Sequence, residues 1–370
     1  MLGRTGLKAS VLGFGAMRLP MVEGHVDREK AIPMFHRAFE AGVNYVDSAV
    51  FYCNDDSQRA VGDALKGWRD RIIVSTKNHH YEKSNKAGWW SHLENSLSRL
   101  QVQHIDIYNH HGLNWKAFCE QLDGPDGLYR EMLKAKDQGL IRHICFSFHD
   151  SCENLIKLID TDMFESVTCQ YNLLDRSNEA GIAHAHEKNM GVVIMGPVAG
   201  GRLGETGGDL AASLPGGIAS TPELALRYVM ANPNVTVALS GMSTLQHVIE
   251  NTAVAEKAAD LSPAENTDIA KAMEQLKKMA DLYCTGCGYC KPCPNGVAIP
   301  DIFRMANLYR VYGAKSAARS QYAGLIRDKK DDSKPADACV ECGKCEEKCP
   351  QHIKIMEQLK QAHTLLTSGG

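Results

Sequence analysis

The sequence lacks the features that mark a secreted, membrane-spanning or nucleic-acid-binding chain. Its formal net charge is only −3 over 370 residues, so it offers no strong field of one sign to attract nucleic acid or an anionic membrane. The N-terminal stretch has no long apolar segment of the signal-peptide type, and no apolar run approaches the roughly 18 residues that a membrane helix needs. We therefore expect a cytoplasmic protein that binds neither nucleic acid nor a membrane.

Cysteine is missing from one long part of the chain. None lies between Cys169 and Cys284, whereas five of the thirteen occur up to Cys169 and eight occur from Cys284 onward. Many cysteines indicate disulfides in a small secreted protein, but this chain is large and is expected to be cytoplasmic. The distribution therefore divides the chain into two parts and indicates a cysteine-ligated cofactor in the second.

The first 260 residues repeat a short apolar run, a polar turn and an amphipathic helical stretch. Eight strand-like runs alternating with helices over about 250 residues are typical of a (β/α)₈ TIM barrel. A doubly wound open sheet shows the same alternation, but the GxGxxG turn that usually opens it is missing, since GFGAMR leads to a loop. We therefore predict the barrel. The eight runs are 11–16, 44–49, 71–77, 104–111, 143–148, 166–172, 191–197 and 235–241.

The sequence predicts a second domain beyond the barrel. The barrel is expected to occupy residues 1–262, and residues 263–283 have the pattern of an amphipathic connecting helix. Residues 284–370 are then expected to form a small, mainly helical domain of the ferredoxin type. Within it, one cysteine run lies on either side of the helix-like stretch 299–328.

The two cysteine runs have the spacing of iron–sulfur ligands. The second, CVECGKCEEKCP, is spaced C-x₂-C-x₂-C-x₃-C-P, as in the bacterial ferredoxins that bind [4Fe–4S] clusters. Structural zinc is the alternative, but zinc sites usually present CxxC pairs separated by a longer loop. We therefore predict two [4Fe–4S] clusters.

In ferredoxin runs the fourth cysteine ligates the other cluster, so the two runs are expected to exchange ligands. The predicted sets are Cys284, Cys287, Cys290 and Cys349 for one cluster, and Cys339, Cys342, Cys345 and Cys293 for the other. The first run, CTGCGYCKPCP, has only two residues between its third and fourth cysteines, so these sets are less firmly indicated than the cofactor itself.

Polar residues gather at the ends of the predicted strands. In a (β/α)₈ barrel the catalytic groups lie where strands end, at the C-terminal face. Each of these residues alone is commonly a rim or packing residue, but several on one face indicate a catalytic site. They are Asp47, Lys77, His111, Ser147 and Gln170, with Tyr52 on the loop after Asp47.

In these residues and their surroundings the chain resembles the aldo-keto reductases. The resemblance rests on stretches such as NYVDSAVFY, HIDIYNHHG and GMSTLQHVIENTAV, and CTGCGYCKPCP resembles the bacterial members that carry a ferredoxin-type domain. It implies an NAD(P)H-dependent oxidoreductase that reduces an aldehyde or ketone by hydride transfer, with an appended iron–sulfur electron-transfer domain.

The resemblance implies a catalytic tetrad of Asp47, Tyr52, Lys77 and His111. Hydride transfer to a carbonyl leaves an alkoxide-like oxygen that needs a proton. Tyr52 is the expected acid, and its pKa of about 10 is expected to be brought down by the Lys77 ammonium. Asp47 is expected to keep Lys77 charged, and His111 to donate a hydrogen bond to the substrate oxygen.

The resemblance also implies a nicotinamide cofactor in an extended form on the C-terminal face. The residues implied to contact it are Ser147 and Gln170 at the carboxamide, Met195, Gly241, Ser243 and His247 along it, and Glu250 and Asn251 near the adenine. Gly241 and His247 stand where many members place basic residues against the 2′-phosphate, so NADH and NADPH both remain open. Arg18 and Arg202 are other basic residues that could supply this pocket.

A second class of function is also open. Nicotinamide transfers two electrons together as a hydride, whereas each cluster accepts one, and the sequence shows no signal for a flavin that would bridge the two. The alternative is an iron–sulfur electron-transfer protein whose barrel is a nucleotide-binding or docking scaffold for a partner protein. The intact tetrad favours the enzyme, acting on a small carbonyl substrate. The sequence indicates neither the particular substrate nor the oligomeric state.

Protein prepared without oxygen should be brown and contain about eight irons per chain with matching sulfide, because two four-iron clusters are predicted. Cys342→Ser should remove one cluster and leave the barrel folded, since domains of this size usually fold independently. Iron and sulfide analysis with circular dichroism would measure both. Stoichiometric zinc with negligible sulfide would contradict the prediction.

Overall fold

The computed structural model describes residues 1–80, 82, 84–173, 175–199, 203, 220–257, 267, 284, 288–310, 315–328 and 333–368. The chain forms two compact units. The first comprises Met1–Pro197 and Ala225–Leu261, and the second Val198–Leu224 and Ser262–Gly370. The predicted connecting helix at 263–283 lies outside the described residues, apart from Thr267.

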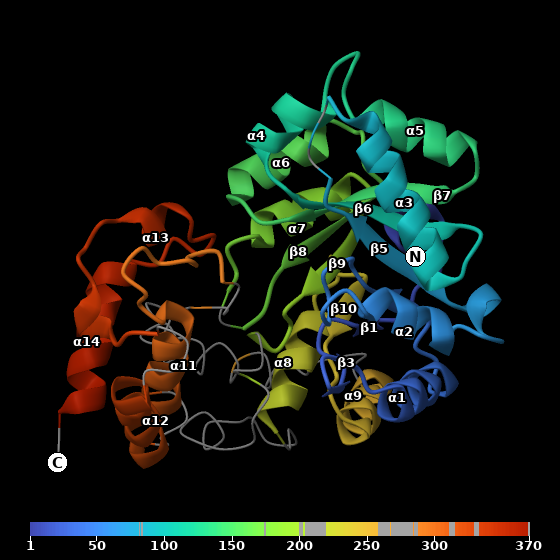
Figure 1. The fold of residues 1–370 in the computed structure, drawn as a ribbon. Coiled ribbons are helices and arrows are strands. Elements are labelled where there is room, and N and C mark those ends of the chain that lie inside the picture. Colours follow the sequence, from blue (N-terminus) through green and yellow to red (C-terminus); the bar gives the residue numbers. More distant parts are fainter. Residues whose placement is uncertain are drawn as a thin grey trace. The chain divides into compact units, whose positions relative to one another are not determined.

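The first unit contains a closed barrel of eight parallel strands (Figure 1). Around the barrel the strands follow the order β1-β10-β9-β8-β7-β6-β5-β4, and β1 pairs with both β10 and β4. Because the sheet closes on itself, the predicted barrel is confirmed and the doubly wound sheet is excluded. The strands are β1 (Leu12–Gly15), β4 (Tyr45–Asp47), β5 (Ile73–Asn78), β6 (Ile105–Leu113), β7 (Ile141–Phe148), β8 (Ser166–Gln170), β9 (Gly191–Met195) and β10 (Val237–Ser240).

Helices follow the strands and form the outer layer of the barrel (Figure 1). Several of them begin with a side-chain cap; Asp27, Asn85 and Ser151, for example, each accept a hydrogen bond from a backbone N–H of the first turn. None of the helices in the described ranges is long and apolar enough to cross a membrane. The longer helices are α1 (Arg28–Glu40), α2 (Ser57–Ala64), α3 (Lys86–Leu100), α5 (Tyr129–Asp137), α6 (Cys152–Asp160), α7 (Glu179–Glu187), α8 (Thr221–Met230) and α9 (Leu245–Lys257).

Apolar side chains fill the barrel toward the N-terminal ends of the strands. Tyr45, Ile107, Val193 and Val237 come from four different strands and pack together with Leu2 from the N-terminal segment. All five are fully buried. The barrel is therefore a packed core and not a channel, which leaves the opposite, C-terminal ends of the strands for chemistry.

A two-stranded hairpin interrupts the connection from β1 to α1, where the sequence indicated only a loop. Its strands are β2 (Met21–Val22) and β3 (His25–Val26), and the two turn residues, Glu23 and Gly24, have φ values of 47° and 84°. Positive φ at both central residues is the tight hairpin geometry that matches strand twist. Strands of two residues are too short to show a periodic pattern, so the sequence did not reveal them.

A β-bulge shapes the end of β6. Its register with β7 shifts between His110 and Leu113, so that His111 and Gly112 stand opposite the single residue Ser147. Gly112 has a φ of 68°, and its N–H donates a 2.8 Å hydrogen bond to Ser147 Oγ. A bulge bends its strand and changes the direction of its side chains. The bulge therefore begins at His111, directly after the buried His110.

The second unit is mainly helical, as predicted. The stretch 299–328 contains two helices, α11 (Ile299–Arg310) and α12 (Lys315–Asp328), which pack with α14 (Ile355–Thr367) (Figure 1). The short helix α13 (Lys344–Glu347) lies within the second cysteine run. A parallel bridge between Val297 and Lys334 joins the segment after the first run to the segment before the second. The two runs are thereby attached to one core.

Candidate functional site

A buried ion pair joins the C-terminal ends of two neighbouring barrel strands. Lys77 Nζ, on β5, lies 2.5 Å from Asp47 Oδ2, on β4, and donates a second hydrogen bond of 2.9 Å to the Ser48 carbonyl. Lys77 is 2% exposed and Asp47 4%, so little water screens their attraction. Burial opposes the charge on Lys77, but its interactions with Asp47 and Tyr52 outweigh this and raise the pKa of Lys77. Lys77 is therefore an ammonium at neutral pH.

Buried polar side chains from the neighbouring strands β5 and β6 hold Asp47 in place. Ser75 Oγ donates a 2.8 Å hydrogen bond to Asp47 Oδ1, and Asn109 Nδ2 donates to Ser75 Oγ at 3.1 Å. Both Ser75 and Asn109 are fully buried. The sequence reasoning missed these two residues. The signal was available, because each is a polar residue inside an otherwise apolar strand run, and buried polar groups need partners.

Tyr52 and His111 approach the ion pair from a loop and from the β6 bulge. Lys77 Nζ lies 4.8 Å from the centroid of the Tyr52 ring. The rings of Tyr52 and His111 lie edge to face, with centroids 6.3 Å apart. The four residues named from the sequence, Asp47, Tyr52, Lys77 and His111, thus come together at the C-terminal ends of β4, β5 and β6.

The acidity of Tyr52 differs from the expectation. Burial raises its pKa and Lys77 lowers it, while Asp47 raises it further, so the pKa of Tyr52 is raised above its ordinary value. The prediction that Lys77 brings this pKa down was right about the direction of the Lys77 effect and wrong about the net result. Tyr52 is therefore protonated at neutral pH, which is the state that a proton donor needs.

Neutral imidazoles surround the ammonium of Lys77. Burial, helped by Lys77 and neighbouring histidines, lowers the pKa of His111 to about 3. His149, which directly follows β7, has its pKa lowered to about 4 by burial and by Lys77. The sequence reasoning passed over His149. A neutral imidazole carries one N–H, so His111 can donate a hydrogen bond without bearing a charge.

The residues implied to contact a nicotinamide cofactor lie at the ends of the later strands. Ser147 is the second-to-last residue of β7, and its hydroxyl accepts a hydrogen bond from the Gly112 N–H. Gln170 is the last residue of β8 and donates a 3.1 Å hydrogen bond to Asp175. Met195, the last residue of β9, is partly exposed. These side chains share the C-terminal face with the tetrad.

The remaining implied cofactor residues follow β10 and extend into α9. Ser243 donates its N–H to His247 Nδ1 at 3.4 Å, and Asn251 donates a 2.9 Å hydrogen bond to Ser240 at the end of β10. Glu250 accepts a 2.8 Å hydrogen bond from Gln246. His247 and Glu250 are exposed.

Arg18 lies beside the glycine at which many relatives would place a basic residue. A Cβ on Gly241 would stand 3.5 Å from Arg18 Cδ and 3.7 Å from Arg18 Cβ. The stem of Arg18 therefore lies over Gly241, and Arg18 is exposed. Arg202, the other basic residue considered, lies outside the described residues.

Cysteines of both runs line one pocket in the second unit. Its thiols belong to Cys290, Cys293, Cys339, Cys342 and Cys345. Four of these five are the ligand set predicted for one cluster. Apolar side chains form much of the remaining wall and would keep water from a bound group, namely Val297, Ile299, Val340, Met356 and Leu359.

The donor set of this pocket fits an iron–sulfur cluster. Burial raises the pKa of Cys345 to about 11, and the nearby Cys339 and Cys293 add to the effect. Thiols in this situation lose their protons when they ligate a metal. In the part of the chain that the structure describes, no three potential ligands gather tightly enough to hold a single metal ion. Thiols spread around a pocket suit a multi-iron cluster, which takes one thiolate at each iron.

The other predicted ligand set is only partly described. Cys284, Cys290 and Cys349 pack against the apolar core of the second unit, which includes Phe303. Cys287 lies outside the described residues.

Comparisons with known proteins agree with both parts of the chain. Residues 11–274 match the aldo/keto reductase family, and residues 283–354 match a 4Fe-4S dicluster domain. The oxidoreductase YqkF of Bacillus subtilis is 28% identical over 283 residues, 68% of this chain and 88% of YqkF. L-galactose dehydrogenase of Arabidopsis thaliana is 26% identical over 309 residues, 75% of this chain and 95% of that protein.

Solved structures agree as well. The holo form of the aldo-keto reductase AKR11C1 from Bacillus halodurans has a TM-score of 0.63 at 30% identity, covering 74% of this chain and 95% of that one. The family match includes all eight barrel strands and the four clustered residues. The chain is therefore an oxidoreductase that belongs to the aldo/keto reductase family and carries a 4Fe-4S dicluster domain after its barrel.

Proposed function

We propose that this protein reduces a small aldehyde or ketone with NADH or NADPH, and that Tyr52 is the general acid. The observation that carries the proposal is the buried Lys77–Asp47 pair, with the Lys77 ammonium 4.8 Å from the Tyr52 ring. A buried ammonium costs free energy unless it is paired, and here it lies beside the phenol of Tyr52. Such an arrangement favours negative charge on the Tyr52 oxygen.

The nicotinamide supplies the hydride when it is bound. Tyr52 Oη then transfers its proton to the substrate oxygen, which is more basic as an alkoxide than the phenolate left behind. The ammonium of Lys77 stabilises that phenolate, and Asp47 balances the charge of Lys77 throughout. Because Asp47 is itself fixed by Ser75 and Asn109, little rearrangement accompanies the proton transfer.

His111 orients the carbonyl. As a neutral group it donates one N–H to the substrate oxygen and leaves proton transfer to Tyr52. Its neutrality follows from burial and from the positive charge of Lys77, which oppose a second positive charge at this place.

We further propose that the second unit binds two [4Fe–4S] clusters through the two ligand sets named above. The thiol-lined pocket and the match of residues 283–354 to a dicluster domain support this. Clusters bound there would carry single electrons to or from a partner protein. We propose a cytoplasmic location, where thiols stay reduced, and a domain division at 1–262, 263–283 and 284–370.

Tyr52→Phe should lower kcat for carbonyl reduction by about 10²–10⁴-fold, because it removes the proton donor and keeps the ring. Nucleotide affinity should barely change, since the hydroxyl acts in the transition state. Lys77→Met should cause a similar loss because the phenolate loses its partner. Steady-state kinetics with small aldehydes would measure both.

The matched control is Tyr129→Phe, which removes a hydroxyl bonded to the Met163 carbonyl on the outer layer. It should leave kcat unchanged. Normal turnover by both Tyr52→Phe and Lys77→Met would favour a barrel that serves as a scaffold. Loss of carbonyl reduction with retained transfer of NADH electrons to an artificial one-electron acceptor would indicate a second route through the clusters.

The pH dependence of kcat should show no ionisation near 6.5, because the pKa of His111 is lowered to about 3 and its proton uptake lies below the assay range. We expect kcat to stay level between about pH 5 and 8, the range in which an ordinary histidine would titrate. A break near 6.5 that disappears in His111→Gln would show that His111 acts as a charged group.

NADH should bind at least as tightly as NADPH at neutral pH, since Gly241 and His247 offer no permanent positive charge to a 2′-phosphate. Arg18→Met should weaken NADPH more than NADH, because Arg18 is the cation beside Gly241. Fluorescence titration would measure both. Arg142→Met, at the start of β7, is the control and should change neither. A hundredfold preference for NADPH that survives Arg18→Met would mean that another residue binds the phosphate.

A further inference from the structure

We propose that the Arg28–Asp56 ion pair and the left-handed turn Cys53–Asp55 position Tyr52 for proton transfer. Arg28 and Asp56 are positioning residues that act through the loop carrying Tyr52 and do not touch the substrate. The inference rests on the proposed role of Tyr52 as the acid.

The three residues after Tyr52 all have left-handed backbone. Cys53, Asn54 and Asp55 have φ values of 54°, 54° and 65°, and none of them is glycine. This conformation is unfavourable for a residue such as Cys53, and although Asn and Asp tolerate it better, three such residues in succession are held only where the surroundings impose them. The direction in which the Tyr52 side chain leaves the loop therefore depends on contacts made by the turn.

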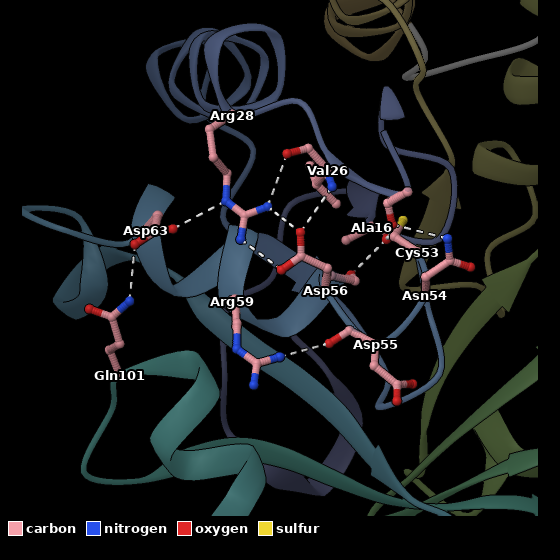
Figure 2. A network of polar contacts seen from close by, with 12 residues as sticks. Ala16, Val26, Arg28, Cys53, Asn54, Asp55, Asp56, Arg59, Asp63 and Gln101 are labelled. Carbon is pink, nitrogen blue, oxygen red and sulfur yellow. Dashed lines mark hydrogen bonds and ion pairs between the residues drawn. The ribbon is translucent and has the colours of Figure 1, made fainter. Parts of the chain in front are cut away.

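Each residue of the turn is attached to a different segment. Asn54 Nδ2 donates a 3.0 Å hydrogen bond to the Gly24 carbonyl in the β2–β3 hairpin, and the Cys53 thiol contacts the Met17 carbonyl at 3.5 Å. The Asp55 carbonyl accepts a 3.1 Å hydrogen bond from the Arg59 guanidinium on α2. Figure 2 shows these contacts converging on the loop.

Asp56 fastens the end of the turn to the start of α1. One of its oxygens accepts the Val26 N–H at 2.9 Å, and Arg28 donates to both oxygens at 2.5 and 2.9 Å (Figure 2). Arg28 also donates to Asp63 on α2 at 3.2 Å. The paired fork of Arg28 is directional, so it fixes the carboxylate in orientation as well as in place.

The contacts continue from Asp56 to the catalytic group through its neighbour Ser57. The Ser57 N–H donates to the Tyr52 carbonyl at 3.1 Å, and Ser57 Oγ lies 2.8 Å from Ser48 Oγ. The Ser48 carbonyl in turn accepts the Lys77 ammonium. These hydrogen bonds connect Ser48 and Ser57, the two ends of the loop that carries Tyr52, next to Lys77. Arg28 holds Asp56 on the side of the loop that faces α1.

Loss of Arg28 would leave the buried Asp56 carboxylate without its cation and allow the loop to move. Proton transfer needs the Tyr52 oxygen within hydrogen-bond reach of the substrate, and a displacement of about 1 Å can cost roughly a hundredfold in rate. The hydrogen bonds that the structure describes for the Arg28 side chain and the Asp56 carboxylate go to Val26, to Asp63 and to each other, and none goes to a residue proposed to bind nucleotide. Their effect should therefore fall on kcat and not on nucleotide binding.

The first test compares Arg28→Met, Arg28→Lys and Arg4→Met, assayed well below their melting temperatures. We expect Arg28→Met to lower kcat by about ten- to a hundredfold with an unchanged Kd for NADH, and Arg28→Lys to recover part of the rate. Arg4→Met removes another arginine–aspartate pair of the barrel, to Asp162 at 3.4 Å, and should keep the parent kcat. A parent-like kcat in Arg28→Met, with Tyr52→Phe inactive, would overturn the positioning role and leave the acid in place.

The second test addresses the turn and does not depend on the ion pair. Cys53→Val and Cys53→Gly both remove the thiol contact, but valine adopts a φ of 54° poorly whereas glycine adopts it freely. We expect Cys53→Val to lower kcat as Arg28→Met does, and Cys53→Gly, which loses the thiol contact but adopts the φ freely, to retain a clearly higher kcat than Cys53→Val. Equal kcat values in these two variants would overturn the inference. Normal activity in Tyr52→Phe would overturn the proposed function along with it.

Discussion

The arrangement at the C-terminal face depends on the ion pair between Lys77 and Asp47. A lysine that is 2% exposed stays charged only because a carboxylate 2.5 Å away compensates for the lost water. Burial keeps His111 and His149 neutral, and the charge of Lys77 adds to this effect. The same charge opposes the effect of burial on the pKa of Tyr52. Ser75 donates a hydrogen bond to Asp47, and Lys77 donates one to the Ser48 carbonyl. These two hydrogen bonds fix the positions of Asp47 on β4 and Lys77 on β5.

The two units of the chain offer different chemistry. The barrel offers a site for hydride transfer, and the second unit offers soft thiolate ligands in an apolar pocket. These chemistries move electrons in different numbers, so the two units need not act in the same step. Whether electrons pass between the two units is tested in the barrel by the Tyr52 variant and in the second unit by the Cys342 variant.

Local sequence pattern predicted the features that depend on near neighbours, such as the eight strands of the barrel. It did not predict features that depend on pairing between distant segments. The bulge at His111 arises from the register of β6 against β7, and the acidity of Tyr52 from burial by residues far along the chain. The ion pair of Arg28 with Asp56 joins the start of α1 to the start of α2, and neither residue stands out in its own segment.

The bridge between Val297 and Lys334 has a consequence for the assembly of the second unit. The cysteines of the two runs can meet only if the chain between Cys293 and Cys339 closes into a loop, and loop closure costs entropy. Here the bridge and the core around Phe303 supply protein contacts that help to close that loop. These contacts offset part of the closure entropy, so more of the free energy of ligation is left to retain a bound metal.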